Sequence, residues 1–442
     1  MNESSQIIVV GAGIAGLTAA WQLQKSGISV EVLEAESIVG GRMQSIRVDD
    51  AIIDSGAQFL SNIYSVIPKL IQEAGLSDSY VATKEWVGLI SHKHIALIHS
   101  KKPWHLVSSH LLSVADFFRL GLNQFKIFAL KKKSLSFNDI TTWIQYDDIL
   151  AYDWIVKNFG KSIADELTST LINGFYFQSL KESSASLAAA VVGFSAYKPQ
   201  TMTLTGGMGS LPKKMAEQLN VKVDVRVLSI EENSTGVVIA TDSGTYQADH
   251  VILAVPAPNA KKILRNPDAH TSALFDTTYS SSATISFLTQ DDWSPPESIS
   301  CAYGFLFKPR WNTRVAAMTI ENNKCASRKT QGYLINIMLS DLWAKKMLHL
   351  SDDEIVAEIR SDVENVFPAI YQHIQAKNIF RWENAMPCTP IGRAKLVKDY
   401  RDSRVSTNRV WLAGDYLGFP WTDSAAQTGV WASSQVIQSY LL

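Results

Sequence analysis

The feature that most constrains this chain is a glycine-rich turn near its amino terminus, set between an apolar run and a helical pattern. Residues 7–10 are apolar and stop at Gly11, and residues 17–25 carry apolar side chains at helical spacing. Polar and apolar side chains then alternate over 29–34. Strand, turn, helix and strand within about 30 residues indicate a βαβ unit. We therefore predict an α/β fold that begins with a parallel sheet.

The turn reads GAGIAG over 11–16 and fits the pattern G-x-G-x-x-G. In that pattern the first glycine permits the turn, the second lets a pyrophosphate approach the backbone, and the third lets the helix pack on the strand. Unpaired N–H groups at the helix amino terminus add an anion site. A plain glycine turn is the alternative for the motif in isolation. The residues predicted to contact a diphosphate are Gly11, Gly13, Ile14, Ala15 and Gly16.

Glu34 ends the second strand, about 20 residues after the turn. A carboxylate there can accept hydrogen bonds from both hydroxyls of a ribose, and it would repel a 2′-phosphate. The alternative is an ordinary charge at a strand end. The position predicts FAD or NAD, rather than NADP, beside Glu34 and the adjacent Ala35.

A second glycine pair and an arginine distinguish FAD from NAD. Two glycines bring the backbone close to a cofactor, and Arg42 can form charge-assisted bonds to a diphosphate or reach the flavin edge. A domain that binds only NAD has no need of this second clamp, so FAD is the predicted cofactor. The residues predicted to contact it here are Gly40, Gly41, Arg42, Gly56, Ala57, Gln58 and Phe59.

A third group of candidates lies near the carboxyl terminus, after a predicted strand at 410–413. Asp415 could bond a ribityl hydroxyl or a water that faces the diphosphate. A helix predicted from Asp423 would aim its amino terminus at the flavin pyrimidine, where negative charge accumulates on reduction. The predicted cofactor contacts are Gly414, Asp415, Thr422, Asp423 and Ala425.

Through these motifs the sequence resembles the flavin-containing amine oxidase superfamily, which also holds protoporphyrinogen oxidases and carotenoid-type desaturases. The matching segments, in the family's order, are VVGAGIAGLTAAWQL, VLEAESIVGGRMQS, IDSGAQF, TLTGGMGSLPKKMAEQL, VILAVPAP and VWLAGDYLGFPWTDSAAQTGVWAS. The resemblance implies a Rossmann-like FAD-binding domain of the GR2 type and a substrate cavity on the face of the flavin. It also implies that residues 206–208 contact the cofactor and that Val227 packs near the adenine.

The length of 442 residues predicts more than one domain. We predict a discontinuous FAD-binding domain formed by 1–80, 200–265 and 386–442, and an α+β substrate-binding domain formed by 81–199 and 266–385.

Local patterns predict further elements within these domains. Strands are predicted at 221–230, 237–241 and 250–255, and helices at 113–133 and 153–171.

The resemblance leaves the reaction open. Many amine oxidases carry a lysine, bound through water to flavin N5, shortly before a tryptophan. Here the segment before Trp293 has Ala283 and Thr284 instead. Trp382 and Ala385 look like the start of the W-x-x-A-x-P pattern of the protoporphyrinogen oxidase branch, which Pro387 completes.

Trp421 occupies the position where amine oxidases place an aromatic wall over the flavin. Such a ring can orient an amine by its π face and confine it in a dry pocket. A tryptophan that only packs at a helix entrance is the alternative. We predict that Trp421 faces the substrate, and that FAD is bound non-covalently because the offset of Cys388 from Trp382 does not match the relatives that attach flavin to a cysteine.

The leading prediction for the reaction is hydride transfer from a C–H next to an amine nitrogen to flavin N5, with reoxidation by O₂. The first alternative is FAD-dependent desaturation of a C–C or ring bond in a large apolar substrate of the porphyrinogen or carotenoid kind. The second is a lipid-binding escort protein of the same fold that has lost its flavin.

The resemblance implies a small-molecule partner, either an amine or a large apolar ring compound. The chain has 41 basic and 42 acidic side chains and a net charge of −1, so nucleic acid is not an expected partner. Its three distant cysteines favour a reduced, cytoplasmic protein. The spacing of His92, His94, His99 and His105 suggests no tetrahedral set, so no metal is predicted.

Membrane association is the less favoured reading of two. No run reaches about 18 apolar residues, so no transmembrane helix is predicted. Residues 113–133 combine phenylalanines with lysines, as a helix on a membrane surface would. We favour a helix of the substrate domain that ends in a solvated lysine run.

Overall fold

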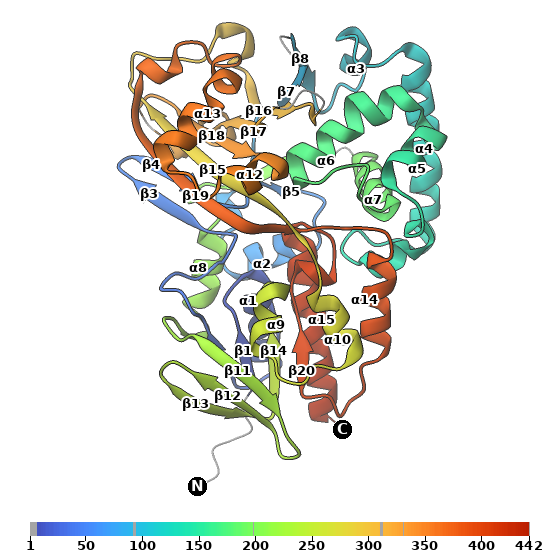
Figure 1. The fold of residues 1–442 in the computed structure, drawn as a ribbon, viewed down its shortest axis with the longest axis vertical. Helices are drawn as coiled ribbons and strands as arrows, with labels where there is room; N and C mark the ends of the chain where they lie inside the picture. Colours follow the sequence, from blue (N-terminus) through green and yellow to red (C-terminus); the bar gives the residue numbers. More distant parts are fainter. Residues whose placement is uncertain (1–6, 92–93, 198, 310–312, 330, 442) are drawn as a thin grey trace.

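The structure, a computed structural model, describes residues 7–91, 94–197, 199–309, 313–329 and 331–441. Its centre is a parallel five-stranded sheet with the order β10-β2-β1-β14-β20 (Figure 1). These strands are β1 (Ile7–Val10), β2 (Val30–Leu33), β10 (Asn220–Lys222), β14 (His250–Leu253) and β20 (Val410–Leu412). The predicted α/β fold with an amino-terminal βαβ unit is confirmed.

Both faces of this sheet are covered, which explains why β1 is a continuous apolar run rather than an alternating one. Ile7 and Val9 pack with α1 (Ile14–Lys25) and α15 (Thr422–Leu441). Ile8 and Val10 pack on the opposite face, with α9 (Ala257–Ile263) and the neighbouring strands. Because the strands are parallel, their carboxyl ends meet at one edge, and the glycine turn leaves β1 there.

A three-stranded antiparallel meander lies beside the central sheet, at the bottom of Figure 1. It consists of β11 (Val227–Glu232), β12 (Val237–Thr241) and β13 (Gly244–Ala248). The prediction of one strand over 221–230 is wrong. Val221 pairs with Val32 of the parallel sheet, whereas Val227 pairs with Thr241 of the meander. Asp224, with a φ of +56°, turns the chain between them.

A second, seven-stranded sheet has the order β19-β15-β18-β17-β16-β7-β8. Its strands are β7 (Trp86–Ser91), β8 (His94–His99), β15 (Tyr279–Thr289), β16 (Ala302–Phe307), β17 (Val315–Ile320), β18 (Leu334–Leu339) and β19 (Ile374–Pro387). Helices α12 (Asp341–Met347) and α13 (Asp352–Glu364) cover one face. The two segments predicted to form a substrate domain thus share one sheet, and their division from the FAD-binding segments stays a prediction.

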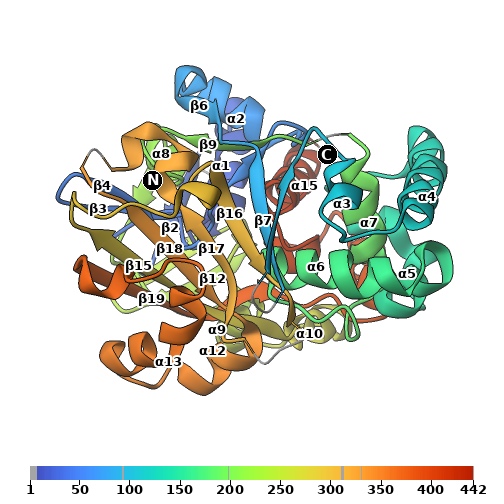
Figure 2. The same ribbon diagram turned by 90° about the horizontal axis from the view of Figure 1, so that it is seen from above.

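A helical region lies beside this sheet (Figure 2). It contains α4 (Val114–Ser134), α5 (Ala151–Phe159), a π-helical turn (Ile163–Thr168), α6 (Ser169–Tyr176) and α7 (Ala185–Ser195). The helix predicted over 153–171 is interrupted, because Gly160 ends α5 with a φ of +102°. No described helix is long and apolar enough to cross a bilayer.

The other elements connect these layers. The strands are β3 (Ser45–Val48), β4 (Ala51–Asp54), β5 (Leu60–Ser61), β6 (Tyr80–Ala82) and β9 (Thr201–Leu204). The helices are α2 (Ile67–Glu73), α3 (His105–Ser108), α8 (Ser210–Ala216), α10 (Ala269–Phe275), α11 (Glu321–Lys324) and α14 (Arg393–Asp402).

Candidate functional site

The glycine turn has the geometry of a phosphate cradle. Gly11 has a φ of +102°, and a Cβ at Gly16 would lie 2.0 Å from the carbonyl oxygen of Gly11. A Cβ at Gly13 would meet nothing within 4 Å, so this residue faces open space at the amino terminus of α1. The space in front of Gly13, Ile14 and Ala15 fits a diphosphate that accepts hydrogen bonds from helix N–H groups.

Glu34 lies against this turn. Its carboxylate accepts hydrogen bonds from the N–H of Ala12 at 2.7 Å and from the N–H of Glu36 at 3.0 Å. The carbonyl of Glu34 accepts from the N–H of Val225 at 2.8 Å, two residues before Val227. The segment that leads into β11 therefore lies beside Glu34 and Ala35, where the resemblance puts the ribose and the adenine.

The second glycine pair joins the first. The N–H of Gly40 donates to the carbonyl of Ala12 at 2.9 Å, and Gly40 forms a parallel bridge with Gly13. A Cβ at Gly41 would have only the Cα of Gly13 near it, at 3.6 Å. The two glycine segments thus form one surface with no side chains, as a closely approached cofactor requires.

Arg42 and Asp415 bind one another. Nη2 of Arg42 lies 2.8 Å from Oδ1 of Asp415, Nη1 lies 2.8 Å from Oδ2, and Nη1 also donates to the carbonyl of Ala385 at 2.9 Å. Burial alone would lower the pKa of Arg42, but the Asp415 carboxylate outweighs it and raises that pKa. The two side chains neutralise each other, and direct contact of either one with a nucleotide stays a prediction.

The segment 56–59 is held from both sides. The N–H of Ala57 donates to the carbonyl of Arg42 at 2.8 Å, and a Cβ at Gly56 would lie 2.3 Å from that carbonyl oxygen. Nε2 of Gln58 donates to two backbone carbonyls of its own loop, each at 2.9 Å. The ring of Phe59 meets that of Phe175 edge to face, at 5.4 Å.

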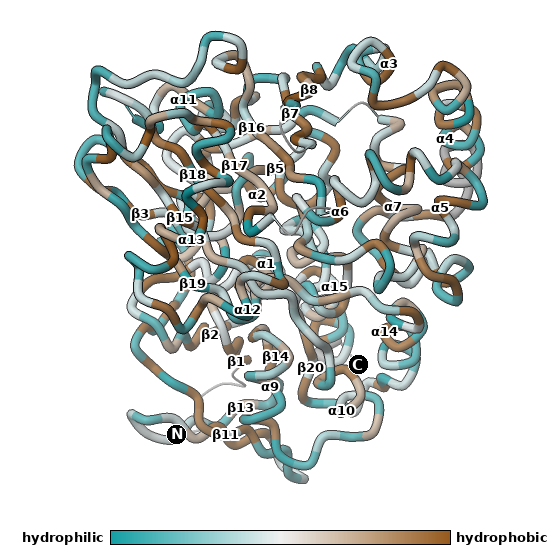
Figure 3. The backbone as a smooth tube through the Cα atoms, turned by 45° about the horizontal axis from the view of Figure 1, so that its top comes forward, coloured by the Kyte–Doolittle hydropathy of each residue, from teal (hydrophilic) through white to brown (hydrophobic). Residues whose placement is uncertain are grey.

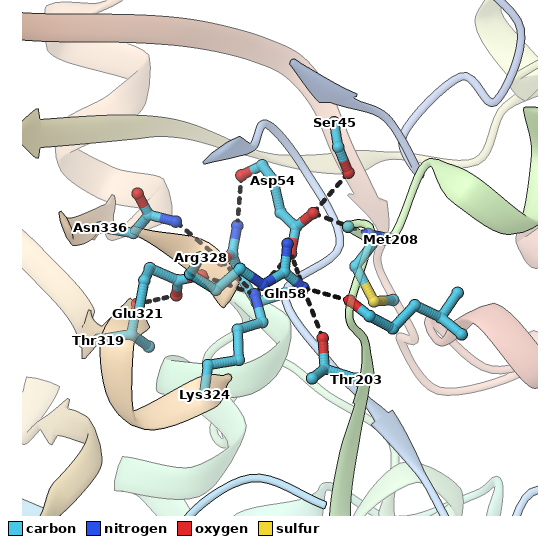
Figure 4. Close-up of polar contacts among 12 residues, drawn as sticks. Ser45, Asp54, Gln58, Thr203, Met208, Thr319, Glu321, Lys324, Arg328 and Asn336 are labelled. Atoms are coloured by element: carbon cyan, nitrogen blue, oxygen red, sulfur yellow. Dashed lines mark hydrogen bonds and ion pairs between the residues drawn. The ribbon is translucent and has the colours of Figure 1, made fainter. Parts of the chain in front are cut away.

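Behind this loop lies a buried ion cluster formed by Asp54, Glu321, Lys324 and Arg328 (Figure 4). The side chains of all four are fully buried. Nζ of Lys324 lies 2.6 Å from the Asp54 carboxylate and 3.0 Å from that of Glu321, and Nη2 of Arg328 lies 3.0 Å from Asp54. Burial alone would raise the pKa of Asp54, but the two cations outweigh it and lower that pKa.

The ion cluster fixes loops that carry predicted cofactor contacts. Oδ1 of Asp54 accepts a hydrogen bond from the N–H of Met208 at 2.8 Å, within the segment 206–208. Nζ of Lys324 lies 3.4 Å from Oε1 of Gln58, and Nδ2 of Asn336 donates to the same oxygen at 3.2 Å. Sequence reasoning missed this cluster because Lys324 is 270 residues away from Asp54 and resembles an ordinary surface lysine.

Trp421 belongs to an aromatic group before α15. Its ring stacks on Phe419 with centroids 4.6 Å apart, and the ring of Tyr176 from α6 lies 6.0 Å away. Nε1 of Trp421 is buried and has no hydrogen-bond partner among the described residues. Burial raises the pKa of Tyr176 above its usual range, so the hydroxyl stays neutral. The group can confine an apolar or cationic substrate.

Asp423 links the start of α15 to the start of α2. Its carboxylate accepts hydrogen bonds from the N–H groups of Ser65, Val66 and Ile67, at 2.8, 2.9 and 2.6 Å, where α2 begins. Burial raises the pKa of Asp423, and these bonds oppose the rise. The side chain is therefore engaged with α2. The helix amino terminus formed by Thr422, Asp423 and Ala425 stays the predicted flavin contact.

Strand β15 has small side chains, and no lysine, in the segment before Trp293. Ala283 packs in the core beneath α12 and α13. Side chains alternate along the strand, so Thr284 and Ser286 point to the opposite face of the sheet from Ala283. Oγ of Ser286 donates to Oδ1 of Asn336 at 2.6 Å, and Asn336 in turn contacts Gln58.

The histidine group does not form a metal site in the part of the chain that the structure describes, where no three His, Cys, Asp or Glu side chains converge suitably. His92 lies outside the described residues. The N–H of His99 donates to Nδ1 of His105 at 3.2 Å.

Three comparisons with known proteins bear on this site. A model of the family described as flavin containing amine oxidoreductase matches residues 14–437. A probable flavin-containing monoamine oxidase A of Dictyostelium discoideum is 26% identical over 60% of each chain, so the match spans three-fifths of that relative's length. Coproporphyrinogen III oxidase of Mycobacterium leprae is 27% identical over 96% of this chain and 97% of its own. The solved structure of a putrescine oxidase covers 98% of this chain at 19% identity with a TM-score of 0.78, which shows a shared fold.

The open glycine cradle, the strand-end glutamate and the second glycine pair fit FAD, and the family match spans them all except the first residues of the turn. The chain is thus an FAD-dependent oxidoreductase that belongs to the flavin-containing amine oxidoreductase family.

Proposed function

We propose that this chain oxidises an amine by removing a hydride from the carbon next to nitrogen, with O₂ as the final acceptor. The observation that carries the proposal is the aromatic group of Trp421, Phe419 and Tyr176 at the amino terminus of α15. Bound FAD supplies the hydride acceptor, its N5 atom. The chain supplies orientation, exclusion of water and an electrostatic environment.

The aromatic group favours a neutral amine held by its apolar portion. Aromatic rings pack against the apolar portion of a substrate and exclude water once the substrate is seated. Neither Arg42 nor Asp415 is available as a free charge, because each neutralises the other. A neutral amine needs no general base to lose a hydride, and the group of Trp421 offers none.

A second candidate is desaturation of a large apolar ring compound of the porphyrinogen kind, or of a carotenoid. Three observations favour it. Strand β15 has Ala283 and Thr284 in place of a lysine. Nε1 of Trp382 donates to the carbonyl of Ser55 at 2.7 Å, and Ala385 accepts from Arg42, so the W-x-x-A-x-P segment is tied to the cofactor loops. A coproporphyrinogen III oxidase also matches along nearly the whole chain.

Anaerobic flavin bleaching distinguishes the two candidates. The purified holoprotein is mixed without oxygen with a panel of primary and secondary amines, and separately with reduced porphyrin compounds, while absorbance near about 450 nm is followed. Bleaching by amines, with recovery when air is admitted, supports the amine proposal. Bleaching by the porphyrinogens alone refutes it in favour of the second candidate.

The same sample tests the alternative of a lipid-binding escort protein of the same fold that has lost its flavin. An escort protein without flavin would lack the yellow absorbance altogether, even after incubation with FAD. The open cradle at Gly13 and the carboxylate of Glu34 beside it favour a chain that still binds flavin.

A further inference from the structure

Helix α4 lies on the outer edge of the molecule (Figures 1 and 2). It carries a row of exposed apolar side chains. Val114, Phe118, Leu122 and Phe125 are 59%, 65%, 66% and 69% exposed, and Trp104, just before α3, is 56% exposed. The first four make up the α4 face, and α3, which begins one residue after Trp104, contacts α4. The five are among the twelve large apolar side chains that are exposed in the described part of the chain, and they include both exposed phenylalanines. Such a concentration marks a surface that meets a partner.

The apolar residues of the α4 face are exposed although α4 itself is packed on the rest of the fold. The spacing of four, four and three residues places all four α4 positions on one side of the helix. On another side Leu120 and Ile127 are buried. Ile127 packs on Gly193 of α7, and Nε2 of Gln124 donates to Oγ of Ser195 at 2.7 Å. The helix therefore has one apolar side for the core and a second one that the chain leaves uncovered.

Basic side chains accompany the α4 face. The helix contains five basic residues and one acid, although the whole chain has a net charge of −1. Arg119 and Lys126, both exposed, each follow a phenylalanine of the face by one residue. Exposed Lys102 precedes Trp104, as does exposed Lys101, which pairs with Glu85. Figure 3 shows the same mixture as alternating brown and teal along α4.

We propose that the α4 face docks the protein on a lipid bilayer that contains anionic lipids. A helix with phenylalanine and leucine on one side and basic residues beside them can lie in the interface, with its apolar side among the acyl chains and its cations at the headgroups. Tryptophan prefers that interface. A second copy of the chain is the less suitable occupant, because a symmetric pair would bring two basic rows together.

Docking would place α4 against the bilayer, with α7 packed behind it. Helix α7, on which α4 packs, carries Phe194, whose ring lies 6.3 Å from that of Tyr64. The proposal concerns membrane attachment only, and it does not depend on which substrate is oxidised. It also reverses the sequence-based preference for a helix of the substrate domain that ends in a solvated lysine run, because Phe118 and Phe125 are exposed.

Vesicle sedimentation tests the proposal. The holoprotein is pelleted with vesicles of phosphatidylcholine alone and with vesicles that also contain phosphatidylglycerol. We expect binding to the mixed vesicles that falls as salt is added. The triple variant F118S/L122S/F125S should bind at least about tenfold less, and R119E/K126E should lose the preference for anionic lipid.

The matched control is L342S/I391S/V405S, which removes side chains that are 56%, 45% and 58% exposed elsewhere. Circular dichroism and bound flavin verify that each variant is folded. The proposal is overturned if the wild type stays in the supernatant with both vesicle types, or if the control variant loses binding as much as the triple variant. Light scattering that shows a dimer broken by F118S/L122S/F125S, with no vesicle binding, would assign the face to a second copy instead.

Discussion

The guanidinium of Arg42 and the carboxylate of Asp415 form a two-point ion pair, with both N···O distances at 2.8 Å. The two residues are 373 positions apart, and each follows a glycine at the edge of the cofactor site. The pair therefore fastens the amino-terminal part of the site to its carboxyl-terminal part. Its geometry is the paired arrangement that gives arginine and carboxylate their strongest contact.

Replacing Arg42 by methionine should destabilise the protein by about 3 kcal/mol, because it leaves the Asp415 carboxylate without its cation in a mostly buried position. The free energy of unfolding is measured with urea, and FAD retention by gel filtration. Arg360→Met is the control, since the exposed pair of Arg360 with Glu364 should contribute less than about 0.5 kcal/mol. An equal loss of unfolding free energy in the two variants would contradict the role assigned to Arg42.

A methyl group at Gly13 should strongly weaken FAD binding without unfolding the protein. The new Cβ would project into the open space in front of α1, where the diphosphate must approach. We expect FAD affinity to fall by roughly a hundredfold or more, as measured by calorimetry on the apoprotein. Gly121→Ala is the matched control, because a Cβ there also meets nothing within 4 Å. Normal FAD affinity of Gly13→Ala would show that the diphosphate lies elsewhere.

Asp54→Asn should cost about 3 to 5 kcal/mol, because Lys324 and Arg328 would stay buried with one carboxylate fewer between them. Asp399→Asn, in an exposed pair with Lys395, is the control and should change little. An unchanged free energy of unfolding in Asp54→Asn would mean that Asp54 carries no charge in the folded wild type.

The same cluster predicts a dependence on pH. The pKa of Asp54 is lower in the folded protein than the value of about 3.9 in an unfolded chain. Its contribution to stability is therefore complete above about pH 4 and is lost as the pH falls through the folded pKa. Urea unfolding of wild type and Asp54→Asn at a series of acidic pH values should show the two curves converging towards low pH. Curves that stay parallel would refute the linkage.

Trp421→Ala should slow flavin reduction while FAD stays bound, since the ring belongs to the aromatic group and not to the glycine cradle. We expect a loss of at least about tenfold in the rate of anaerobic reduction by the best substrate, with partial recovery in Trp421→Phe. Trp343→Ala, on α12, is the control. Unchanged reduction kinetics in Trp421→Ala would place the ring outside the substrate pocket.

Flavin should be released into the supernatant when the holoprotein is precipitated with acid. Burial raises the pKa of the Cys388 thiol, so little reactive thiolate is present at neutral pH. Flavin that stays with the pellet in the wild type and leaves it in Cys388→Ser would instead demonstrate a covalent link.

Local patterns were sufficient where one short segment determines the geometry. The run GAGIAG needs no distant partner to form its turn, so β1, α1 and β2 were predicted close to their observed bounds. The break at Asp224 was not predictable in the same way, because each half of 221–230 fits a strand and only the tertiary partners, Val32 and Thr241, decide which sheet each half joins. A periodic pattern therefore does not predict which of two sheets a strand joins.

The buried ion cluster and the α4 face show the same limit for side chains. The sequence of residues 321–328 does not predict that Lys324 lies against Asp54, because the contact depends on how two distant segments pack. On α4 the spacing identifies apolar positions, but it does not say that Leu120 is covered while Phe118 is not. Burial is a property of the assembled fold.

The late position of β20 has a consequence for synthesis. This strand pairs with β14 in the parallel sheet, and α15 after it packs on α1, where a Cβ at Gly429 would lie 2.2 Å from the carbonyl oxygen of Ala15. Between the synthesis of β14 and that of β20, β14 is therefore an open sheet edge, and one side of α1 is bare until α15 has formed. An unpaired strand edge can pair with other chains, so the unfinished sheet is open to wrong pairing during this interval.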